Sequence, residues 1–157
     1  MYQRVGRFTL YSFHQNGRHE CEFDNFLSTY DTAENTQNIN KMAAALREFA
    51  KRGVDRRRFR PKGEGPVDAL LAGPDNLRLY IIPCSADSLI VGNGCFKNEA
   101  ILQNVPECKK AWDLMMELDK ALKGRLLDKS IYWEENWDGN LSYCELAGDL
   151  YFELGNC

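Results

Sequence analysis

The chain of 157 residues is long enough to form one domain with its own hydrophobic core. Hydrophobic residues make up 44% of it and charged residues 27%, which is typical of a globular domain and argues against a disordered chain. Its apolar runs are too short to span a membrane, and its first residues do not resemble a signal peptide. We therefore expect a cytoplasmic protein with no membrane partner.

The first third of the chain predicts a strand followed by two helices. Residues 7–13 are rich in aromatic and β-branched side chains, which favour a strand. Apolar residues then recur at helical spacing over 23–30 and again over 39–50, and Gly53 follows as a natural helix end. Because only a short polar link separates the two helices, we expect an antiparallel helical hairpin.

A strongly basic segment follows the second helix. Residues 47–62 contain eight Lys or Arg and two acidic residues, and Pro61 and Gly63 favour a loop at its end. Such a cluster attracts phosphate groups, although charge runs also serve only to keep a surface solvated. Phe59 interrupts the cluster, where it would either stack on a base or anchor the loop inward. The candidate phosphate ligands are Arg56, Arg57, Arg58, Arg60 and Lys62.

Two strands joined by a short turn form the centre of the prediction, over residues 77–82 and 89–97. Alternation places Arg78 and Tyr80 on one face, and Lys97 lies just past the partner strand. A cation and a phenol projecting together would form an anion-facing surface. The simpler alternatives are an Arg78 that pairs with a carboxylate and a Tyr80 that only packs. Since Pro83 cannot donate to a sheet, the first strand should end there or lie at an edge.

The remaining chain predicts a third helix and then β-structure. An apolar stripe runs over residues 106–124, with Pro106 near its start and Gly124 at its end. Residues 130–146 read as a hairpin with a turn at Asp138 and Gly139, and 146–154 could continue as a strand. No Lys or Arg follows Ser130, so this extension is acidic. It would either fold over the basic segment or form a solvated hairpin that extends the sheet.

These elements predict an α+β fold in which the helical hairpin and the third helix pack on a small, mainly antiparallel sheet, with a C-terminal β-hairpin extension. We expect residues 1–124 to form the main domain and residues 125–157 an acidic extension packed on it. The six cysteines include no CxxC pair, so we predict reduced, mostly buried thiols rather than a metal site. His14 and His19 read as exposed surface residues. No motif for a cofactor is present.

Short motifs in this order resemble a known family. The sequences NLRLY at residues 76–80 and GNGCFKN at 92–98, placed after a strand, a helical hairpin and a basic connection, resemble the RelE/ParE superfamily of toxins from type II toxin–antitoxin modules. The resemblance is closest to the RelE and HigB-like branch and covers residues 5–123, with residues 104–107 as a third matching point.

The resemblance implies a compact RelE-like α+β fold and, in the RelE branch, cleavage of mRNA in the ribosomal decoding site without a metal. In that reaction the 2′-hydroxyl attacks the adjacent phosphate. Arg78 would stabilise the transition-state charge, Lys97 would assist or act as the acid, and Tyr80 would orient the nucleotide or transfer a proton. The basic residues Arg56, Arg57, Arg58, Arg60 and Lys62 would hold the RNA backbone. An antitoxin protein would restrain the enzyme, and the sequence leaves both a monomer and a homodimer open.

Two departures from the family's pattern favour a second reading. The central region has no histidine, and residues 105–124 contain no tyrosine to serve as a C-terminal catalytic residue. The alternative is therefore a non-catalytic binding protein on the same scaffold, either a topoisomerase inhibitor or a module for a protein partner.

Overall fold

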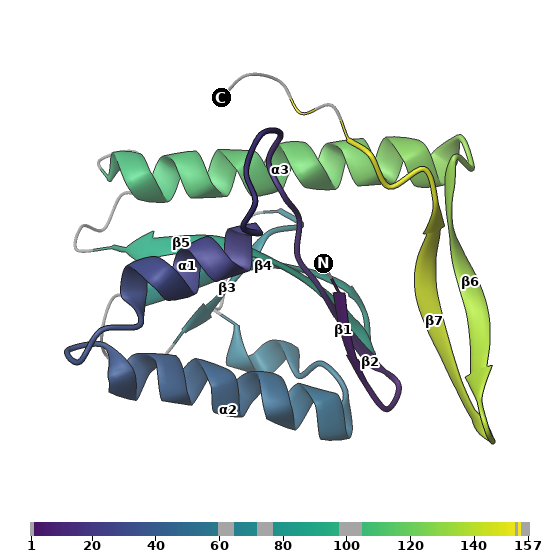
Figure 1. Ribbon diagram of the computed structural model, residues 1–157, viewed down its shortest axis with the longest axis horizontal. Coiled ribbons are helices and arrows are strands. Elements are labelled where there is room, and N and C mark those ends of the chain that lie inside the picture. Colours follow the sequence, from purple (N-terminus) through teal and green to yellow (C-terminus); the bar gives the residue numbers. More distant parts are fainter. Residues whose placement is uncertain (1, 60–64, 72–76, 98–104, 153, 155–157) are drawn as a thin grey trace.

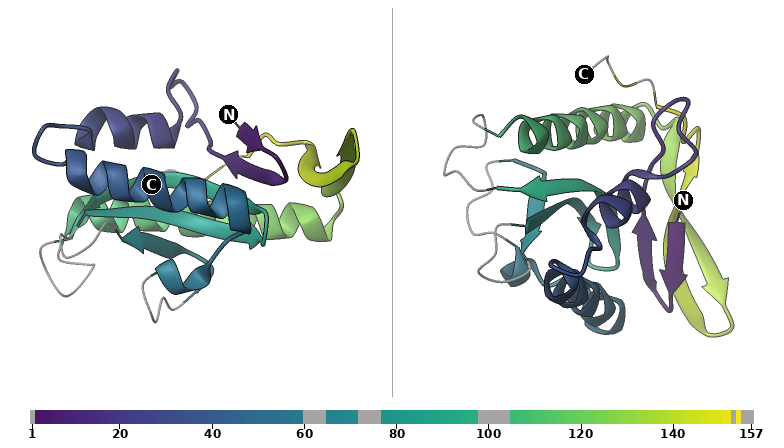
Figure 2. Two further views of the ribbon diagram at one scale, coloured as in Figure 1. Left: turned by 90° about the horizontal axis from the view of Figure 1, so that it is seen from below. Right: turned by 60° about the vertical axis from the view of Figure 1, so that its left-hand side comes forward.

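The computed structural model describes residues 2–59, 65–71, 77–97, 105–152 and 154, which form three layers (Figures 1 and 2). Helices α1 (Glu22–Tyr30) and α2 (Thr36–Arg52) cover one face of a sheet. Helix α3 (Pro106–Leu127) covers the other face. A single-turn 3₁₀ helix, η1 (Arg56–Arg58), follows α2. The predicted mixed α+β class is confirmed.

The central sheet has five strands in the order β1-β2-β5-β4-β3. Strands β2 and β5 run parallel, and the other neighbours run antiparallel, so the sheet is mostly antiparallel as predicted. The chain path permits the parallel pair, because a long connection that includes α1 and α2 separates these two strands in sequence. The five strands are β1 (Tyr2–Val5), β2 (Phe8–Tyr11), β3 (Asp68–Leu71), β4 (Leu77–Ser85) and β5 (Ser88–Phe96).

The C-terminal extension forms a separate two-stranded sheet rather than an extension of the main one. Strands β6 (Ile131–Asp138) and β7 (Leu141–Gly148) pair along their whole length. Their turn includes Gly139 at a φ of 59°, a left-handed conformation that glycine adopts without strain. The possible further strand over 146–154 is not formed beyond Gly148, since residues 149–152 lie in neither helix nor strand.

Two helix boundaries agree with the prediction and a third does not. Gly53 ends α2 with a φ of 84° and donates its N–H to the carbonyl of Phe49, and Pro106 begins α3. The predicted end of α3 at Gly124 is wrong, because the helix continues to Leu127. Leu126 packs against the core under this extra turn, which offsets the weak helix propensity of glycine.

The sequence reading missed β1 and β3, which are four residues each and carry little periodic signal. Of the two expectations for Pro83, a strand end or an edge position, the first is wrong, because β4 continues to Ser85. Pro83 is tolerated because β3 pairs with β4 only up to Ile81, so at Pro83 the strand has β5 as its single described neighbour. The strand is therefore locally an edge, as the missing N–H requires.

A bulge in β5 determines which side chains face α3. Leu79 pairs with Gly94, but Ile81, two residues on, pairs with Val91, so β5 holds one extra residue between these pairs. Val91 consequently packs with Leu79 and Ile81 beneath α1 and α2, whereas Cys95 lies with Tyr80 beneath α3. Without the bulge, alternation would keep Val91 and Cys95 on the same face.

Glu22 at the start of α1 joins three parts of the fold. Its side chain is 1% exposed, and its carboxylate accepts hydrogen bonds from the side-chain amides of Gln15 at 2.8 Å, Asn25 at 3.2 Å and Asn93 at 3.1 Å. Asn93 comes from the bulge, so this carboxylate connects β5, α1 and the turn before α1. A buried carboxylate is tolerated here because its oxygens have partners.

We expect Glu22→Ala to lower the free energy of unfolding by about 2–4 kcal/mol, because three amides lose a buried acceptor. Glu22→Gln should lose less, since it retains one carbonyl oxygen. Urea unfolding monitored by circular dichroism measures both, with Glu20→Ala at the neighbouring exposed position as the control. Equal midpoints for Glu22→Ala and Glu20→Ala would show that the network does not stabilise the fold.

Candidate functional site

Tyr80 lies beneath α3 and not on an open surface. Its side chain is 1% exposed, its ring meets Trp112 edge-on with centroids 5.4 Å apart, and its hydroxyl lies 3.5 Å from the sulfur of Cys95. This is the geometry of a packing residue. In this arrangement the phenol does not reach a molecule in solvent.

The structure brings Arg78 and Lys97 to the same end of β4 and β5. Arg78 pairs with Cys95 across the two strands, and Lys97 follows Cys95 by two residues. Arg78 is half-buried and Lys97 is 5% exposed, so their cationic groups are much less accessible than the sequence suggested. Arg78 and Lys97 therefore lie at one end of the two strands, as predicted, but they expose little of their charged groups to solvent.

A disulfide ties this end of β5 to α3. Cys95 and Cys108 are bonded and both fully buried, with their Cα atoms 5.2 Å apart, so the prediction of reduced thiols is wrong for this pair. The physical reason is the β5 bulge, which turns Cys95 toward the first turn of α3. Sequence spacing alone could not show this, because a bulge reverses the facing of every later residue in the strand.

The free cysteines of the described residues differ in exposure: Cys21 is buried, Cys84 is intermediate and Cys144 is exposed. Burial, with a smaller effect from the carboxylate of Asp119, raises the pKa of the Cys84 thiol to about 12. Cys84 therefore stays protonated at neutral pH and is a poor nucleophile. Cys157 lies outside the described residues.

Arg56, Arg57 and Arg58 form an exposed basic turn on η1. Asp55 caps this turn by accepting the backbone N–H of Arg57 at 3.1 Å and also holds its guanidinium through two further hydrogen bonds, of 2.9 and 3.0 Å. These hydrogen bonds lower the pKa of the Asp55 carboxyl. Arg60 and Lys62, the other two predicted phosphate ligands, lie outside the described residues.

Phe59 anchors the basic turn to the core. Its side chain is 4% exposed and packs edge-on against Phe49, with ring centroids 5.7 Å apart. Phe59 also forms an isolated β-bridge with Leu70 of β3. Of the two roles that the sequence left open for Phe59, the structure shows the inward anchor. The basic turn therefore sits at the β3 edge of the sheet.

The acidic hairpin lies at the other edge of the sheet. Asp138 forms an ion pair with Arg4 of β1 at 3.0 Å, and the guanidinium of Arg4 lies 4.0 Å from the ring centre of Tyr143. At the base of the hairpin, the backbone N–H of Leu146 donates to the hydroxyl of Tyr11 at 2.9 Å. The described contacts thus join the hairpin to β1 and β2, and they do not place it over the basic turn at β3.

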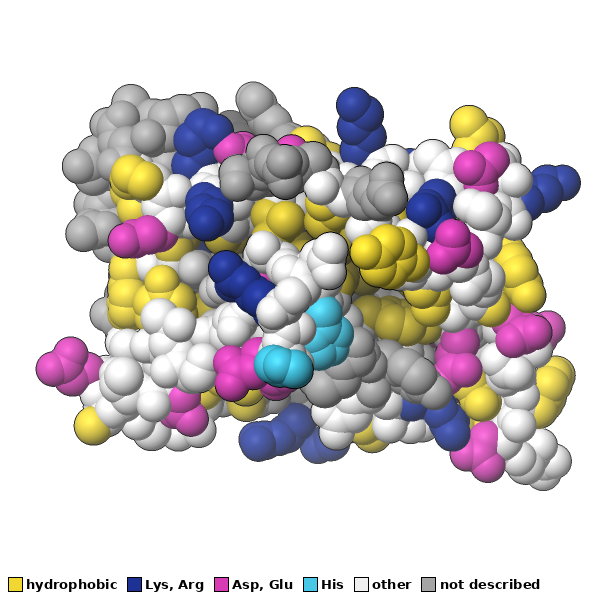
Figure 3. All heavy atoms as spheres, turned by 45° about the horizontal axis from the view of Figure 1, so that its top comes forward, with side chains coloured by type: hydrophobic (Ala, Val, Ile, Leu, Met, Phe, Trp, Pro, Cys, Tyr) yellow, Lys and Arg dark blue, Asp and Glu magenta, His cyan; other side chains and the backbone are white. Residues whose placement is uncertain are grey.

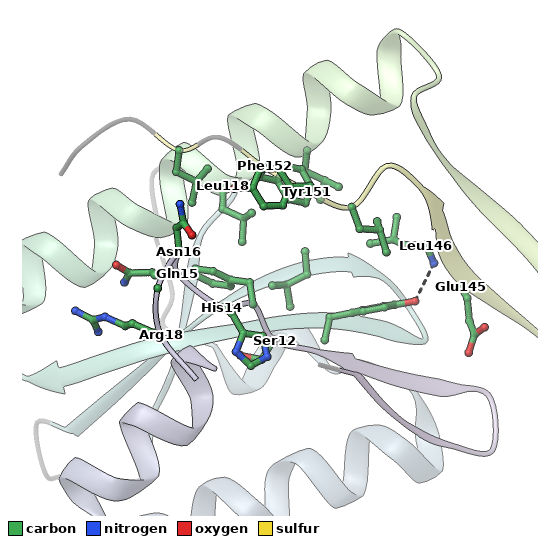
Figure 4. A pocket seen from close by; sticks show the side chains of 17 residues that line it. Ser12, His14, Gln15, Asn16, Arg18, Leu118, Glu145, Leu146, Tyr151 and Phe152 are labelled. Carbon is green, nitrogen blue, oxygen red and sulfur yellow. Dashed lines mark hydrogen bonds between the residues drawn. The ribbon is translucent and has the colours of Figure 1, made fainter. Parts of the chain in front are cut away.

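A cavity of about 520 Å³ lies between β2, β5, α3, the base of β7 and the C-terminal segment (Figure 4). Buried Ile90, Leu118 and Leu122 form part of its wall. Figure 3 shows a hollow floored by hydrophobic side chains beside the two histidines on this face. His14 lines the cavity and is exposed, as expected for a surface histidine. No sequence motif indicated this cavity, because its walls come from segments as distant in sequence as Tyr11 and Leu154.

Comparisons with protein-family models, with characterised proteins and with solved structures find no match to this chain. Among the described residues, no group of three or more His, Cys, Asp or Glu side chains could hold a metal ion. No helix within the same ranges is both long and apolar enough to cross a membrane. The geometry of the chain's own residues is therefore the basis for a functional proposal.

We expect Tyr80→Phe to change the free energy of unfolding by less than about 1 kcal/mol, because it removes only the hydroxyl. Tyr80→Ala should cost about 3–5 kcal/mol, since it opens a cavity beneath Trp112. Thermal and urea unfolding measure both variants, and Tyr132→Ala, at a position 49% exposed, is the control. A Tyr80→Phe loss as large as that of Tyr80→Ala would contradict a packing role.

Proposed function

We propose that this chain is a toxin-like RNA-binding protein on a RelE-like scaffold and that it binds RNA through the basic turn. The observation that carries the proposal is the run of three exposed arginines, Arg56–Arg58, held in one capped and anchored turn. The order of elements also supports it. Strand β2, helices α1 and α2, the basic turn, β4 and β5 follow one another in the order that suggested the family.

The basic turn has the chemistry of a phosphate-backbone contact. A guanidinium offers planar, two-pronged donors that match phosphate oxygens, and its charge is permanent. Because Asp55 and Phe59 already hold the turn, binding would not have to order the backbone there. Such contacts are independent of sequence and weaken as salt is added, since bound phosphates release their counterions.

Metal-independent cleavage of the bound mRNA is a second candidate function, favoured by the placement of Arg78 and Lys97 at one end of β4 and β5. The 2′-hydroxyl would lose its proton to water as its oxygen attacks the phosphorus, so that a 2′,3′-cyclic phosphate forms and the 5′-oxygen of the next nucleotide leaves. Arg78 would offset the charge that develops on the phosphoryl oxygens, and Lys97 would give a proton to the leaving oxygen. Tyr80 lies under Trp112, so in this geometry binding is better supported than catalysis.

A protein partner, such as an antitoxin, would fit the side of the molecule formed by the β1–β2 hairpin and helices α1 and α2. An apolar groove of about 350 Å³ runs between the β1–β2 hairpin and helices α1 and α2, with Arg47 at its rim. Its size and lining suit one face of an amphipathic helix whose flank carries acidic residues. The apolar lining includes Val5, Leu10, Phe23, Leu27, Met42 and Leu46.

RNA binding should depend on the basic turn and not on positive charge in general. We expect Arg56→Ala/Arg58→Ala to bind a labelled 20-nucleotide single-stranded RNA about tenfold more weakly at 50 mM KCl and to lower the salt slope by roughly 1.4, at about 0.7 per phosphate contact. Fluorescence anisotropy between 50 and 200 mM KCl measures both quantities.

The matched control is Lys110→Ala/Lys120→Ala, which removes two exposed cations from α3. It should retain the affinity of the original chain within about twofold. Equal weakening in both double variants, or no binding at 50 mM KCl, would exclude the basic turn as the RNA contact.

Cleavage should be visible on induced expression in a bacterial host. If the second candidate is correct, the original chain arrests growth and creates new mRNA ends, and both effects disappear in Arg78→Ala and in Lys97→Ala. Mapping of mRNA ends makes this measurement, with circular dichroism to confirm that each variant folds. Arrest without new ends would exclude cleavage and favour a topoisomerase or another protein target, and absence of arrest would exclude a toxin.

A further inference from the structure

The cavity between α3 and the C-terminal segment has no role in the proposed function, and it has the properties of a ligand site. We propose that it binds a small, uncharged aromatic molecule. The proposal is independent of RNA binding, since the basic turn at the β3 edge contributes no residue to the cavity.

The size and walls of the cavity suit a compact apolar molecule. Its volume of about 520 Å³ lies within the range of small-molecule sites in proteins. Ile90, Leu118 and Leu122 are at most 5% exposed, so the wall that they form belongs to the rigid core between the sheet and α3. A ligand body placed here would exchange water for a preformed hydrophobic surface.

Aromatic side chains from separate segments favour an aromatic ligand. Tyr11 and Phe13 enter from β2 and the residues after it, and Tyr151 and Phe152 enter from the C-terminal segment. In Figure 4, Phe152 lies beside Leu118 of α3, across from the segment that carries His14 and Gln15. Rings on both sides allow stacked or edge-on contacts with a planar molecule.

The positions of the formal charges at the rim favour an uncharged ligand body over a charged one. Arg18 and Glu145 both line the cavity, but Figure 4 shows their charged groups directed away from it. Arg18 lies 3.8 Å from the buried carboxylate of Glu22. A ligand charge inside the cavity would therefore lose its hydration without gaining an opposite charge.

The outer wall is held in place without a ligand, although part of it remains exposed. Arg125 donates to the backbone carbonyl of Asp149 at 2.9 Å, contacts its carboxylate at 2.7 Å, and lies 5.4 Å from the ring centre of Phe152. These contacts fix the segment that carries Leu150 and Tyr151, which are still 48% and 62% exposed. A bound ring would cover part of this apolar surface.

A pair of fluorescent probes that share their aromatic core tests the proposal. N-phenyl-1-naphthylamine is uncharged, and 8-anilinonaphthalene-1-sulfonate carries a sulfonate on the same ring system. We expect the full chain to bind one molecule of the uncharged probe saturably and the sulfonate at least about tenfold more weakly, because the guanidinium of Arg18 points away from the cavity.

Leu150→Asp places a carboxylate in the cavity wall and should weaken binding of the uncharged probe by at least about tenfold. Its control is Leu127→Asp, at a position 86% exposed at the end of α3, which should bind like the original chain. Both positions are exposed enough for the variants to fold, and thermal unfolding verifies this. The proposal is wrong if the uncharged probe does not bind saturably, or if the sulfonate binds as tightly as the uncharged probe. It is also wrong if Leu150→Asp leaves binding unchanged, because the probe would then lie in the groove beside α1 and α2.

Discussion

The close packing of one helix against each face of β5 is the constraint on which the rest of the structure depends. A side chain at Gly92 would overlap Met115 of α3, and a side chain at Gly94 would overlap the carbonyl of Arg78 and the ring of Phe26. Glycine at these two positions lets both layers approach the same strand. The bulge lies between them and turns Asn93 toward Glu22, so packing and hydrogen bonding meet at one point of the strand.

The packing of α3 on the sheet also covers the face where the sequence predicted an anion-facing surface with Arg78 and Tyr80. Tyr80 is covered by Trp112, and the disulfide between Cys95 and Cys108 fastens the start of α3 to the strand end that carries Lys97. Chemistry that requires an open anion-facing surface there has little room. A cluster of three exposed arginines lies elsewhere, on a turn that the core anchors through Phe59. Binding to a phosphate backbone therefore agrees with this geometry better than phosphoryl chemistry does.

Local signals predicted those parts of the fold that local interactions determine. Helical periodicity, Gly53 and Pro106 located α2 and the start of α3, and alternation put Arg78 and Tyr80 on one face. The bulge, the disulfide and the cavity were not predictable in this way, because each depends on how distant segments meet. At the candidate site, sequence found the basic turn as a charge cluster, but it could not foresee that α3 would bury Tyr80. The sequence shows where charged residues cluster. It does not show which side chains another element will bury.

The two charged segments are attached to opposite edges of one sheet, which separates a basic turn from an acidic hairpin along the strand order. The basic turn lies beside β3, and the acidic hairpin lies beside β1. A polyanion that approaches the chain is attracted at the edge with the basic turn and repelled at the edge with the hairpin. The net charge of −3 would suggest only repulsion. The separation of charge thus gives an acidic protein one edge that attracts an anion.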